Sequence, residues 1–172
     1  CENGNYYNRF YFVHPDGAVQ HYDKKHLFTF GGEHKRFTAG TERVVVNFRG
    51  VRILLEVCYD LRFPVWSRNL GDYDMILYVA SWPTPRVDAW SALLRARAIE
   101  NQCYVAGVNR MGTDPACEYS GGSAIIDPYG KTIAECPWSR ESAVSADIDM
   151  EALQAFRKKF PVLDDADPFT LI

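Results

Sequence analysis

The chain has 172 residues, the size of one ordinary domain and long enough to bury an apolar core without disulfides or metals. Hydrophobic residues make up 47% of it and charged residues 24%, which excludes intrinsically disordered and low-complexity chains. The formal net charge of −3 and the brevity of its basic clusters argue against nucleic-acid binding, and no apolar run reaches the roughly 18 residues of a membrane span. We therefore expect one domain over 1–172 that binds neither nucleic acid nor membrane.

The first part of the chain predicts two pairs of strands. Segments Phe10–His14 and Ala18–Tyr22 flank a Pro-Asp-Gly turn, which is typical of a β-hairpin. After a polar loop over residues 29–40, strands are expected over Val44–Phe48 and Val51–Val57. The second of these is almost continuously apolar, so it should lie in the middle of a sheet.

The remainder alternates strands with helices. A short helix is expected over Asp60–Asn69, a buried strand over Met75–Ala80, and a helix of about four turns that has Thr84 as its N-cap and runs through Ile99. The later elements follow in this order: a strand over Cys103–Val108, a hairpin over Ser123–Ala134, a strand over Ala143–Ile148, a helix capped by Asp149 and ended by Pro161, and an acidic surface tail over Asp164–Ile172. Hairpins interspersed with helices predict an α/β fold with a mixed sheet.

The five cysteines are Cys1, Cys58, Cys103, Cys117 and Cys136. Their number is odd and no pair has Cys-x-x-Cys spacing, so free thiols in a reducing cytoplasm are the simplest interpretation. Cys58 stands out because it ends a buried strand and starts a tight turn into a helix. A helix N-terminus favours a thiolate and can hold an oxyanion, although a lone cysteine at a strand end is more often structural.

Five short motifs resemble, in order and spacing, those of one enzyme family. Val57–Pro64 resembles the nucleophile segment of the nitrilase superfamily, the carbon–nitrogen hydrolases, and Tyr22–Phe28 resembles the lysine segment of that family. The strand end Ala80–Pro83, the helical segment Arg95–Gln102 and the turn Asp127–Gly130 complete the resemblance. It extends over nearly the whole chain, and it is to the omega-amidase branch in particular.

The resemblance implies a catalytic set of Cys58, Lys24 and Glu33. Cys58 would attack the amide carbon, and Lys24 as an ammonium would stabilise the oxyanion together with the backbone N–H of Tyr59. Glu33 resembles the second glutamate of the family, which positions the substrate and the catalytic groups. The family needs neither a metal nor an organic cofactor, so none is expected here.

Three other residues admit more than one role. Arg62 can pair with Asp60 or Glu100, or it can bind a substrate carboxylate as a bidentate partner. Trp82 can form a wall of the substrate pocket or belong to the core. Glu56 lies two residues before the candidate nucleophile, so strand alternation places both on one sheet face; an internally paired structural carboxylate is favoured over a pocket residue.

The histidines offer a rival catalytic arrangement. His21, His26 or His34 can in principle serve Cys58 as the base of a Cys–His hydrolase, and His26 and His34 can be considered as zinc ligands. Their spacing matches no metal pattern, and the lysine segment favours the carbon–nitrogen hydrolase. We therefore expect no metal site.

The resemblance also implies a four-layer α-β-β-α sandwich whose first segment bears a further glutamate, the general base. No residue within Cys1–Phe10 fits that glutamate, because Glu2 lies in a loop-like string, and the chain does not start with Met. We expect the C-terminal portion of a longer hydrolase, truncated at its N-terminus.

The expected function is hydrolysis of small linear amides, of the omega-amidase type, to a carboxylate and ammonia through a thioester of Cys58. The family implies a homodimer or a larger homo-oligomer. A non-catalytic fragment that serves as an assembly or binding module is the alternative.

Overall fold

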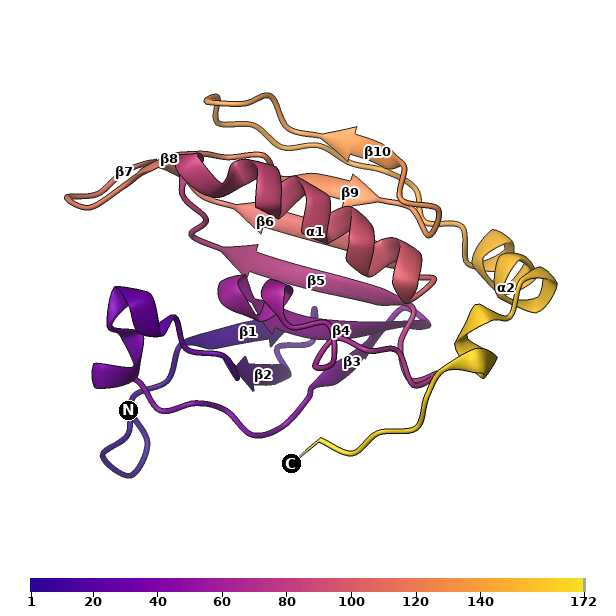
Figure 1. Ribbon diagram of the computed structural model, residues 1–172, viewed down its shortest axis with the longest axis horizontal. Helices are drawn as coiled ribbons and strands as arrows, with labels where there is room; N and C mark the ends of the chain where they lie inside the picture. The colour runs from indigo at the N-terminus through magenta and orange to yellow at the C-terminus, as the bar shows by residue number, and fades with distance from the viewer. Residues whose placement is uncertain (172) are drawn as a thin grey trace.

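The computed structural model describes residues 1–171, and at its centre lies a six-stranded mixed sheet (Figure 1). Its strands are, in spatial order, β10 (Thr132–Glu135), β9 (Ala124–Ile126), β6 (Tyr104–Asn109), β5 (Met75–Ala80), β4 (Val51–Val57) and β3 (Val45–Phe48). β4, β5 and β6 are parallel, and the pairings on either side of them are antiparallel. The predicted α/β class with a mixed sheet is confirmed.

One face of the sheet is covered by the helix α1 (Val87–Glu100), which connects β5 to β6 (Figure 1). Trp90 and Leu94 of this helix are buried and pack with Ile76 of β5 in the core on that face. The helix can approach closely because β6 carries a glycine: a Cβ on Gly107 would lie 2.7 Å from side-chain atoms of both Trp90 and Leu94. Burial of each large side chain stabilises the fold by about 1.5–3 kcal/mol.

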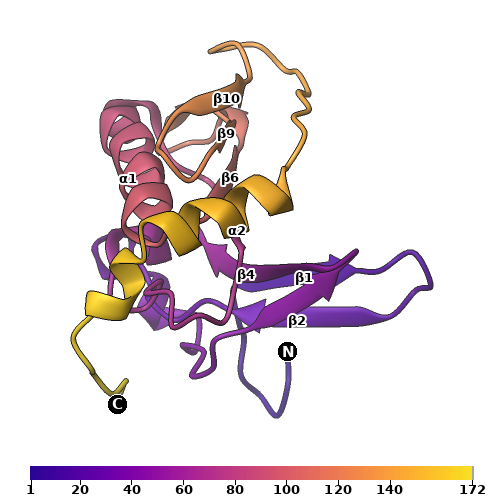
Figure 2. The same cartoon turned by 90° about the vertical axis from the view of Figure 1, so that its right-hand side faces the viewer.

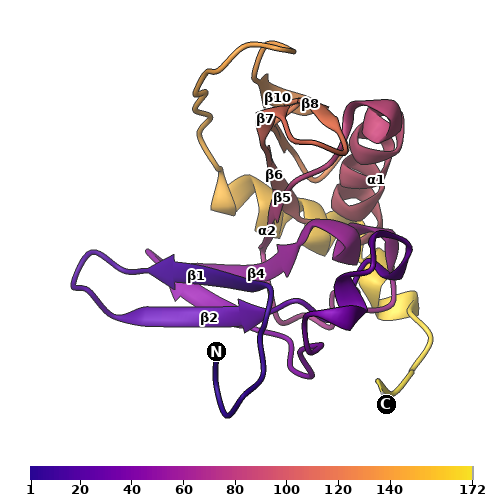
Figure 3. The same cartoon turned by 90° about the vertical axis from the view of Figure 1, so that its left-hand side faces the viewer.

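The opposite face of the sheet meets the hairpin of β1 (Arg9–Val13) and β2 (Val19–Asp23), which projects away from α1 in Figures 2 and 3. Tyr22 of β2 is fully buried in a second apolar core together with Leu55 and Val57 of β4. Successive residues of β4 therefore point alternately into two cores, as the unbroken apolar run of this strand predicts.

The helix α2 (Met150–Lys159) lies at the end of the sheet where the parallel strands begin (Figure 1). Arg157 of this helix donates hydrogen bonds to the backbone oxygens of Gln102 at 2.9 Å and Tyr73 at 3.0 Å, just ahead of β6 and β5. The side chain of Asp149 accepts a hydrogen bond at 2.8 Å from the backbone N–H three residues later, so the predicted N-cap of α2 is confirmed.

The three predicted hairpins and the strands predicted over Met75–Ala80 and Cys103–Val108 are confirmed, with bounds that differ by at most one residue. The helix predicted over Asp60–Asn69 is wrong. The chain instead forms a 3-10 helix, η3, over Cys58–Arg62, and Phe63 leaves the helical conformation with φ −116° and ψ 86°. Pro64 explains the difference, because proline disfavours an α conformation in the residue before it and has no N–H with which to continue a helix.

The start of α1 also differs from the prediction. The segment Thr84–Arg86 forms a 3-10 turn, η4, and α1 begins at Val87 without a side-chain cap, so Thr84 is not an N-cap. Proline at position 85 fits the first turn of either helix type, because the N–H that it lacks would have no partner there.

Two predictions for the last third of the chain were incomplete or wrong. The strand expected over Ala143–Ile148 is wrong, because this segment has no ladder partner among residues 1–171. A short hairpin of β7 (Met111–Thr113) and β8 (Glu118–Ser120) was not expected, since its strands have only three residues each. The acidic tail is largely exposed as far as Leu171, and Ile172 lies outside the described residues. Over residues 1–171, no helix has the length and apolar character that crossing a membrane requires.

Candidate active site

Cys58 is held in a strained turn at the carboxyl end of β4. It is the first residue of η3 and has a φ of 49°, in the left-handed region that residues other than glycine rarely occupy. Such backbone costs of order 1–3 kcal/mol and is concentrated at functional sites. The carboxyl ends of parallel strands are also where α/β proteins bind ligands. Cys58 therefore has the position of an active-site residue.

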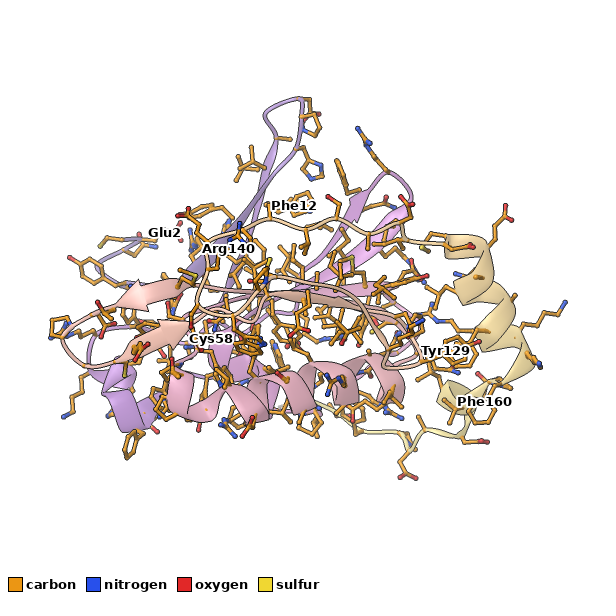
Figure 4. All side chains as sticks on the ribbon, turned by 90° about the horizontal axis from the view of Figure 1, so that it is seen from above. Glu2, Phe12, Cys58, Tyr129, Arg140 and Phe160 are labelled. Carbon is orange, nitrogen blue, oxygen red and sulfur yellow. The ribbon has the colours of Figure 1, made fainter. Side chains whose placement is uncertain are left out.

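A pocket of about 730 Å³ opens over Cys58. This volume falls within the roughly 300–1,000 Å³ of small-molecule sites. The site residues expected from the sequence all line it: Lys24, Glu33, Cys58, Tyr59, Arg62 and Trp82. Figure 4 shows Cys58 at the end of the sheet that lies away from α2, and Phe160 at the other end. The fold thus brings residues from distant parts of the chain into one pocket.

Lys24 and Glu33 form a buried ion pair on one side of this pocket. The Nζ of Lys24 lies 2.6 Å from an Oε2 of Glu33, and the lysine side chain is only 3% exposed. Glu33 also accepts hydrogen bonds from Asn8 Nδ2 at 2.7 Å and from the backbone N–H of Phe28 at 2.6 Å. Burial alone would raise the pKa of the Glu33 carboxyl, but these donors and the charge of Lys24 hold it below its ordinary value. Glu33 is therefore an ionised group that orients Lys24.

The environment of Cys58 raises the pKa of its thiol. Burial is the largest cause, and the positive charge of Lys24 opposes it. The thiol donates a hydrogen bond to the carbonyl oxygen of Ser81 at 3.8 Å. The negative charges of Glu33 and Asp60 raise the pKa further. At neutral pH the sulfur is therefore mostly protonated, and attack by a thiolate needs a proton acceptor nearby.

Arg62 forms neither of the ion pairs considered from the sequence. Its guanidinium lies 5.0 Å from the ring centroid of Trp82, in the pocket. The buried carboxylate of Asp60 accepts hydrogen bonds from other groups, and Glu100 pairs with Arg97 at 2.8 Å. The structural interpretation of Arg62 is therefore wrong within residues 1–171, and its guanidinium is available to a ligand.

Trp82 lies both in the core and at the pocket. Its side chain lines the pocket, yet it is 3% exposed and packs against Trp90 with 5.5 Å between ring centroids. The backbone of Trp82 is fixed by Asn109, whose side chain accepts from its N–H at 2.7 Å and donates to its carbonyl oxygen at 2.9 Å. The wall of the pocket is thus a rigid part of the core.

Among the polar residues that line the pocket, Asn8 and Arg86 belong to none of the motifs and were not expected from the sequence. Asn8 holds Glu33 as described, and the guanidinium of Arg86 lies 5.4 Å from the ring centroid of Phe28. Neither residue belongs to a periodic pattern. The position of Arg86 shortly after the carboxyl end of β5 is the one signal that points to it, because loops at this end of parallel strands carry binding residues.

Glu56 lies outside the pocket and is fully buried beside α1. Its Oε2 accepts a hydrogen bond at 2.9 Å from Ser67, whose hydroxyl lies 3.1 Å from that of Tyr78. Burial, aided by the charge of Asp60, raises the pKa of Glu56 to about 8. This is the internally bonded carboxyl that the sequence favoured. Cys58 lies beyond the strand alternation, because its backbone is left-handed, and it packs against the cores on both faces of the sheet.

The histidines lie outside the pocket that Cys58 lines. None of the pocket residues between positions 1 and 171 is a histidine, and His26 is bonded through Nδ1 to Asp60 at 2.9 Å. His21 and His34 are exposed. The geometry therefore does not support the Cys–His arrangement. Over the same residues, no three histidine, cysteine, aspartate or glutamate side chains are grouped as a metal site would need.

Residues 2–158 match the carbon–nitrogen hydrolase family, and the chain belongs to that family. It is 55% identical over 165 residues to the omega-amidase YafV of Escherichia coli K12, and 40% identical over 167 residues to a 2-oxoglutaramate amidase of Bacillus subtilis. Each alignment covers 95% of this chain and 64% of the relative, so the chain spans just under two thirds of the length of these proteins.

The fold is also similar to that of a solved member of the family. XC1258 from Xanthomonas campestris, a CN-hydrolase superfamily protein with an arsenic adduct in its active site, superposes with a TM-score of 0.96 at 47% identity. The match covers 99% of this chain and 68% of XC1258. The predicted nitrilase-like fold is thus confirmed, and the six-stranded sheet with α1 supplies one sheet and one helical layer of its sandwich.

Proposed function

We propose that the protein is an amidase of the omega-amidase type, which hydrolyses small linear amides to a carboxylate and ammonia. The observation that carries this proposal is the pocket in which Cys58, in a strained turn, meets the buried Lys24–Glu33 ion pair. The names of the Escherichia coli and Bacillus subtilis relatives, an omega-amidase and a 2-oxoglutaramate amidase, support the same reaction. A module that only binds or assembles has no need of this arrangement, so the enzyme is preferred.

In the proposed reaction the thiolate of Cys58 attacks the amide carbon, and the carbonyl π electrons move to the oxygen. Lys24 Nζ and the backbone N–H of Tyr59 donate hydrogen bonds to this oxyanion. A proton delivered to the amide nitrogen lets the C–N bond break, so ammonia leaves and a thioester remains. Water then attacks the thioester through a second oxyanion, and the carboxylate leaves as the Cys58 thiol is restored.

The general base takes the Cys58 proton and later returns it to the leaving nitrogen. Glu33 is poorly suited to this work, because both of its oxygens already accept hydrogen bonds and its pKa is lowered. We assign Glu33 to holding Lys24 in place. We assign the base to the glutamate that the family resemblance puts ahead of the lysine segment, outside the sequence of this chain.

Two arginines of the pocket support a substrate that carries a carboxylate. Arg62 and Arg86 both line the pocket, and each lies over an aromatic ring. Neither is paired with a carboxylate among residues 1–171. The planar guanidinium group matches a carboxylate with two parallel hydrogen bonds. We therefore propose a small dicarboxylic monoamide as substrate, with Arg62 at its free carboxylate and Trp82 as a wall.

We also propose a homodimer or larger homo-oligomer and a cytoplasmic location. The first follows from the family resemblance, and the second is supported by the five cysteines, which are all free thiols. Light scattering after size-exclusion chromatography tests the assembly, and a monomer at micromolar concentration would contradict it.

The experiment that tests the function is ammonia release from a dicarboxylic monoamide. The assay uses a chimera in which this chain is joined to the part of the Escherichia coli YafV sequence that it does not match. We expect ammonia together with a thioester at Cys58 detectable by mass spectrometry, and neither product in the Cys58→Ala variant. A folded chimera that releases no ammonia from charged or neutral amides would overturn the proposal.

A further inference from the structure

The lysine segment contains two side chains that the proposed reaction leaves without a role. Tyr22 and His26 stand two residues before and two residues after Lys24. Both side chains turn away from the pocket, since neither lines it. Both instead bind one buried carboxylate, that of Asp60, which lies in η3 two residues after Cys58.

The carboxylate of Asp60 is fully buried and accepts four hydrogen bonds. Its Oδ2 accepts from the hydroxyl of Tyr22 at 2.8 Å and from the backbone N–H of Val57 at 3.1 Å. Its Oδ1 accepts from the backbone N–H of His26 at 2.8 Å and lies 2.9 Å from Nδ1 of the same residue. The group thus joins the residues on both sides of Lys24 to the end of β4, next to Cys58.

The bond to Val57 matters for the nucleophile itself. Val57 precedes Cys58, and its N–H is bound by the side chain of a residue three positions later, which closes the turn around the sulfur-bearing residue. Because the backbone of Cys58 is left-handed, this turn needs such a bond to persist. One carboxylate therefore braces the nucleophile turn and the lysine segment together.

Aromatic side chains exclude water from this joint. Trp66 donates its indole N–H to the hydroxyl of Tyr22 at 3.0 Å, and the ring of His26 is stacked on Phe63 with 3.8 Å between centroids and 7° between planes. Hydrogen bonds to a charged group are strongest where the surroundings are dry. The segments on either side of Lys24 are consequently fixed at two points.

We propose that Asp60 is a positioning residue that fixes Lys24 in place relative to Cys58, through Tyr22 on one side and His26 on the other. The catalytic meaning of this arrangement rests on the proposed amidase function, whereas the arrangement itself can be measured on the thiol alone. We call the hydrogen bonds of Asp60 to Tyr22 and His26 the clamp. Loss of the clamp would let Lys24 move, while the side chains of Lys24 and Cys58 both remain in the chain.

The positioning role can be separated from the charge of Asp60 because the two act on Cys58 with opposite sign. The negative charge of Asp60 raises the pKa of the Cys58 thiol, so its loss would favour the thiolate. The positive charge of Lys24 lowers that pKa, so displacement of Lys24 would disfavour the thiolate. The other polar groups that act on the thiol or line its pocket are unchanged in the variants below: Asn8, Glu33, Tyr59, Arg62, Ser81 and Arg86.

The test is the pH dependence of Cys58 alkylation by iodoacetamide in the 172-residue chain, followed by peptide mapping. In the Asp60→Asn variant we expect alkylation at pH 8 to fall about three- to tenfold, because reactivity follows the thiolate fraction. Lys24→Ala should reduce it similarly. In the Lys24→Ala background Asp60→Asn should give no further fall, because the lysine through which it acts is gone.

Two controls guard against a general loss of structure. Glu56→Gln changes another fully buried carboxyl that lies outside the pocket, and we expect its alkylation rate to stay within about twofold of the parent. Tyr22→Phe keeps the charge of Asp60 and removes the bond from the Tyr22 hydroxyl to it, together with the bonds that this hydroxyl accepts from Trp66 and from the backbone N–H of Lys25. The bonds from His26 to Asp60 remain, so alkylation should fall in the same direction but less. This second variant decides the question if Asp60→Asn does not fold.

Faster alkylation of Cys58 in Asp60→Asn, or an unchanged rate in both Asp60→Asn and Tyr22→Phe, would overturn the proposal. In the YafV chimera, Asp60→Asn should lower kcat by at least tenfold with KM changed less than about twofold, because the clamp acts on the oxyanion donor and not on substrate binding. A parent chimera without amidase activity would refute the proposed function, while the alkylation result would still decide the role of Asp60.

Discussion

Charged side chains have different partners at the two ends of the central sheet. Where the parallel strands begin, the carboxylate of Asp74 binds Arg52 at 2.8 Å and Arg157 at 2.9 Å, so opposite charges satisfy one another. Where the strands end, Arg62 and Arg86 lie over aromatic rings and face a pocket. Charges satisfied inside the chain stabilise the fold, whereas charges directed into a pocket are available to a ligand.

The largest expected effect lies at the pocket end and concerns Lys24. In the YafV chimera, Lys24→Ala should lower kcat/KM for amide hydrolysis about 10²–10³-fold, because it removes the proposed oxyanion donor. The matched control is Lys25→Ala, since Lys25 does not line the pocket and should leave the rate within about twofold. The rates are measured by ammonia release. An equal loss of kcat/KM in the two variants would contradict a catalytic role that is specific to Lys24.

At the opposite end, Arg157→Ala should affect stability without affecting the pocket. The guanidinium makes hydrogen bonds to Asp74, Tyr73 and Gln102, and its loss leaves buried acceptors unpaired. We expect the free energy of unfolding to fall by about 2–4 kcal/mol in urea titration. The neighbouring Lys158→Ala should change it by less than about 0.5 kcal/mol. A large decrease in Cys58 alkylation for Arg157→Ala would contradict the expectation that this residue affects stability and not the pocket.

A preference for charged substrates would show directly that an arginine at the pocket end of the sheet is available to a ligand. If Arg62 binds a carboxylate, the chimera should hydrolyse a dicarboxylic monoamide better than its uncharged analogue, and Arg62→Ala should narrow that preference about ten- to a hundredfold. Arg95→Ala is the control, because Arg95 is exposed on α1 outside the pocket. Parent kcat/KM values that are equal for charged and neutral amides would exclude the carboxylate-binding role.

The smallest expected effect concerns Glu33, which is satisfied within the chain although it lies at the pocket. The pKa of its carboxyl is lowered in the folded state by Asn8 and Lys24, so its contribution to stability is present above the unfolded-state pKa and is lost as pH falls through the folded-state pKa. Glu33→Gln should therefore flatten the acid limb of a stability–pH curve. Glu42→Gln, at an exposed carboxyl, should leave that limb unchanged. An acid limb of parental steepness in Glu33→Gln would contradict the assignment.

The strands were predictable because their signal is local. The unbroken apolar run of Val51–Val57 marks a strand that is buried on both faces, and the confirmed hairpins are marked by turn residues between short apolar segments. The strand expected over Ala143–Ile148 failed because an extended pattern becomes a strand only where a neighbour supplies hydrogen bonds. Whether a partner strand lies beside a segment depends on the whole fold, and the sequence of the segment alone does not show it.

The site was predictable only where a motif marks it. Lys24, Glu33 and Cys58 were found by resemblance, and the structure places them in one pocket. The clamp at Asp60 could not be found in this way, because its contacts join residues 34 and 38 positions apart. Arg86 was not predicted to line the pocket for a related reason. It lies in η4, the three-residue 3-10 turn before α1, and no periodic pattern in the sequence predicts that this turn brings Arg86 to the pocket.

The left-handed backbone of Cys58 also bears on how this sequence can evolve. Glycine adopts such a conformation without a steric penalty, so a glycine at this position would relax the turn by roughly 1 kcal/mol or more. The proposed reaction needs the thiol, so selection for stability and selection for that reaction act on position 58 in opposite directions. The backbone alone would favour glycine here.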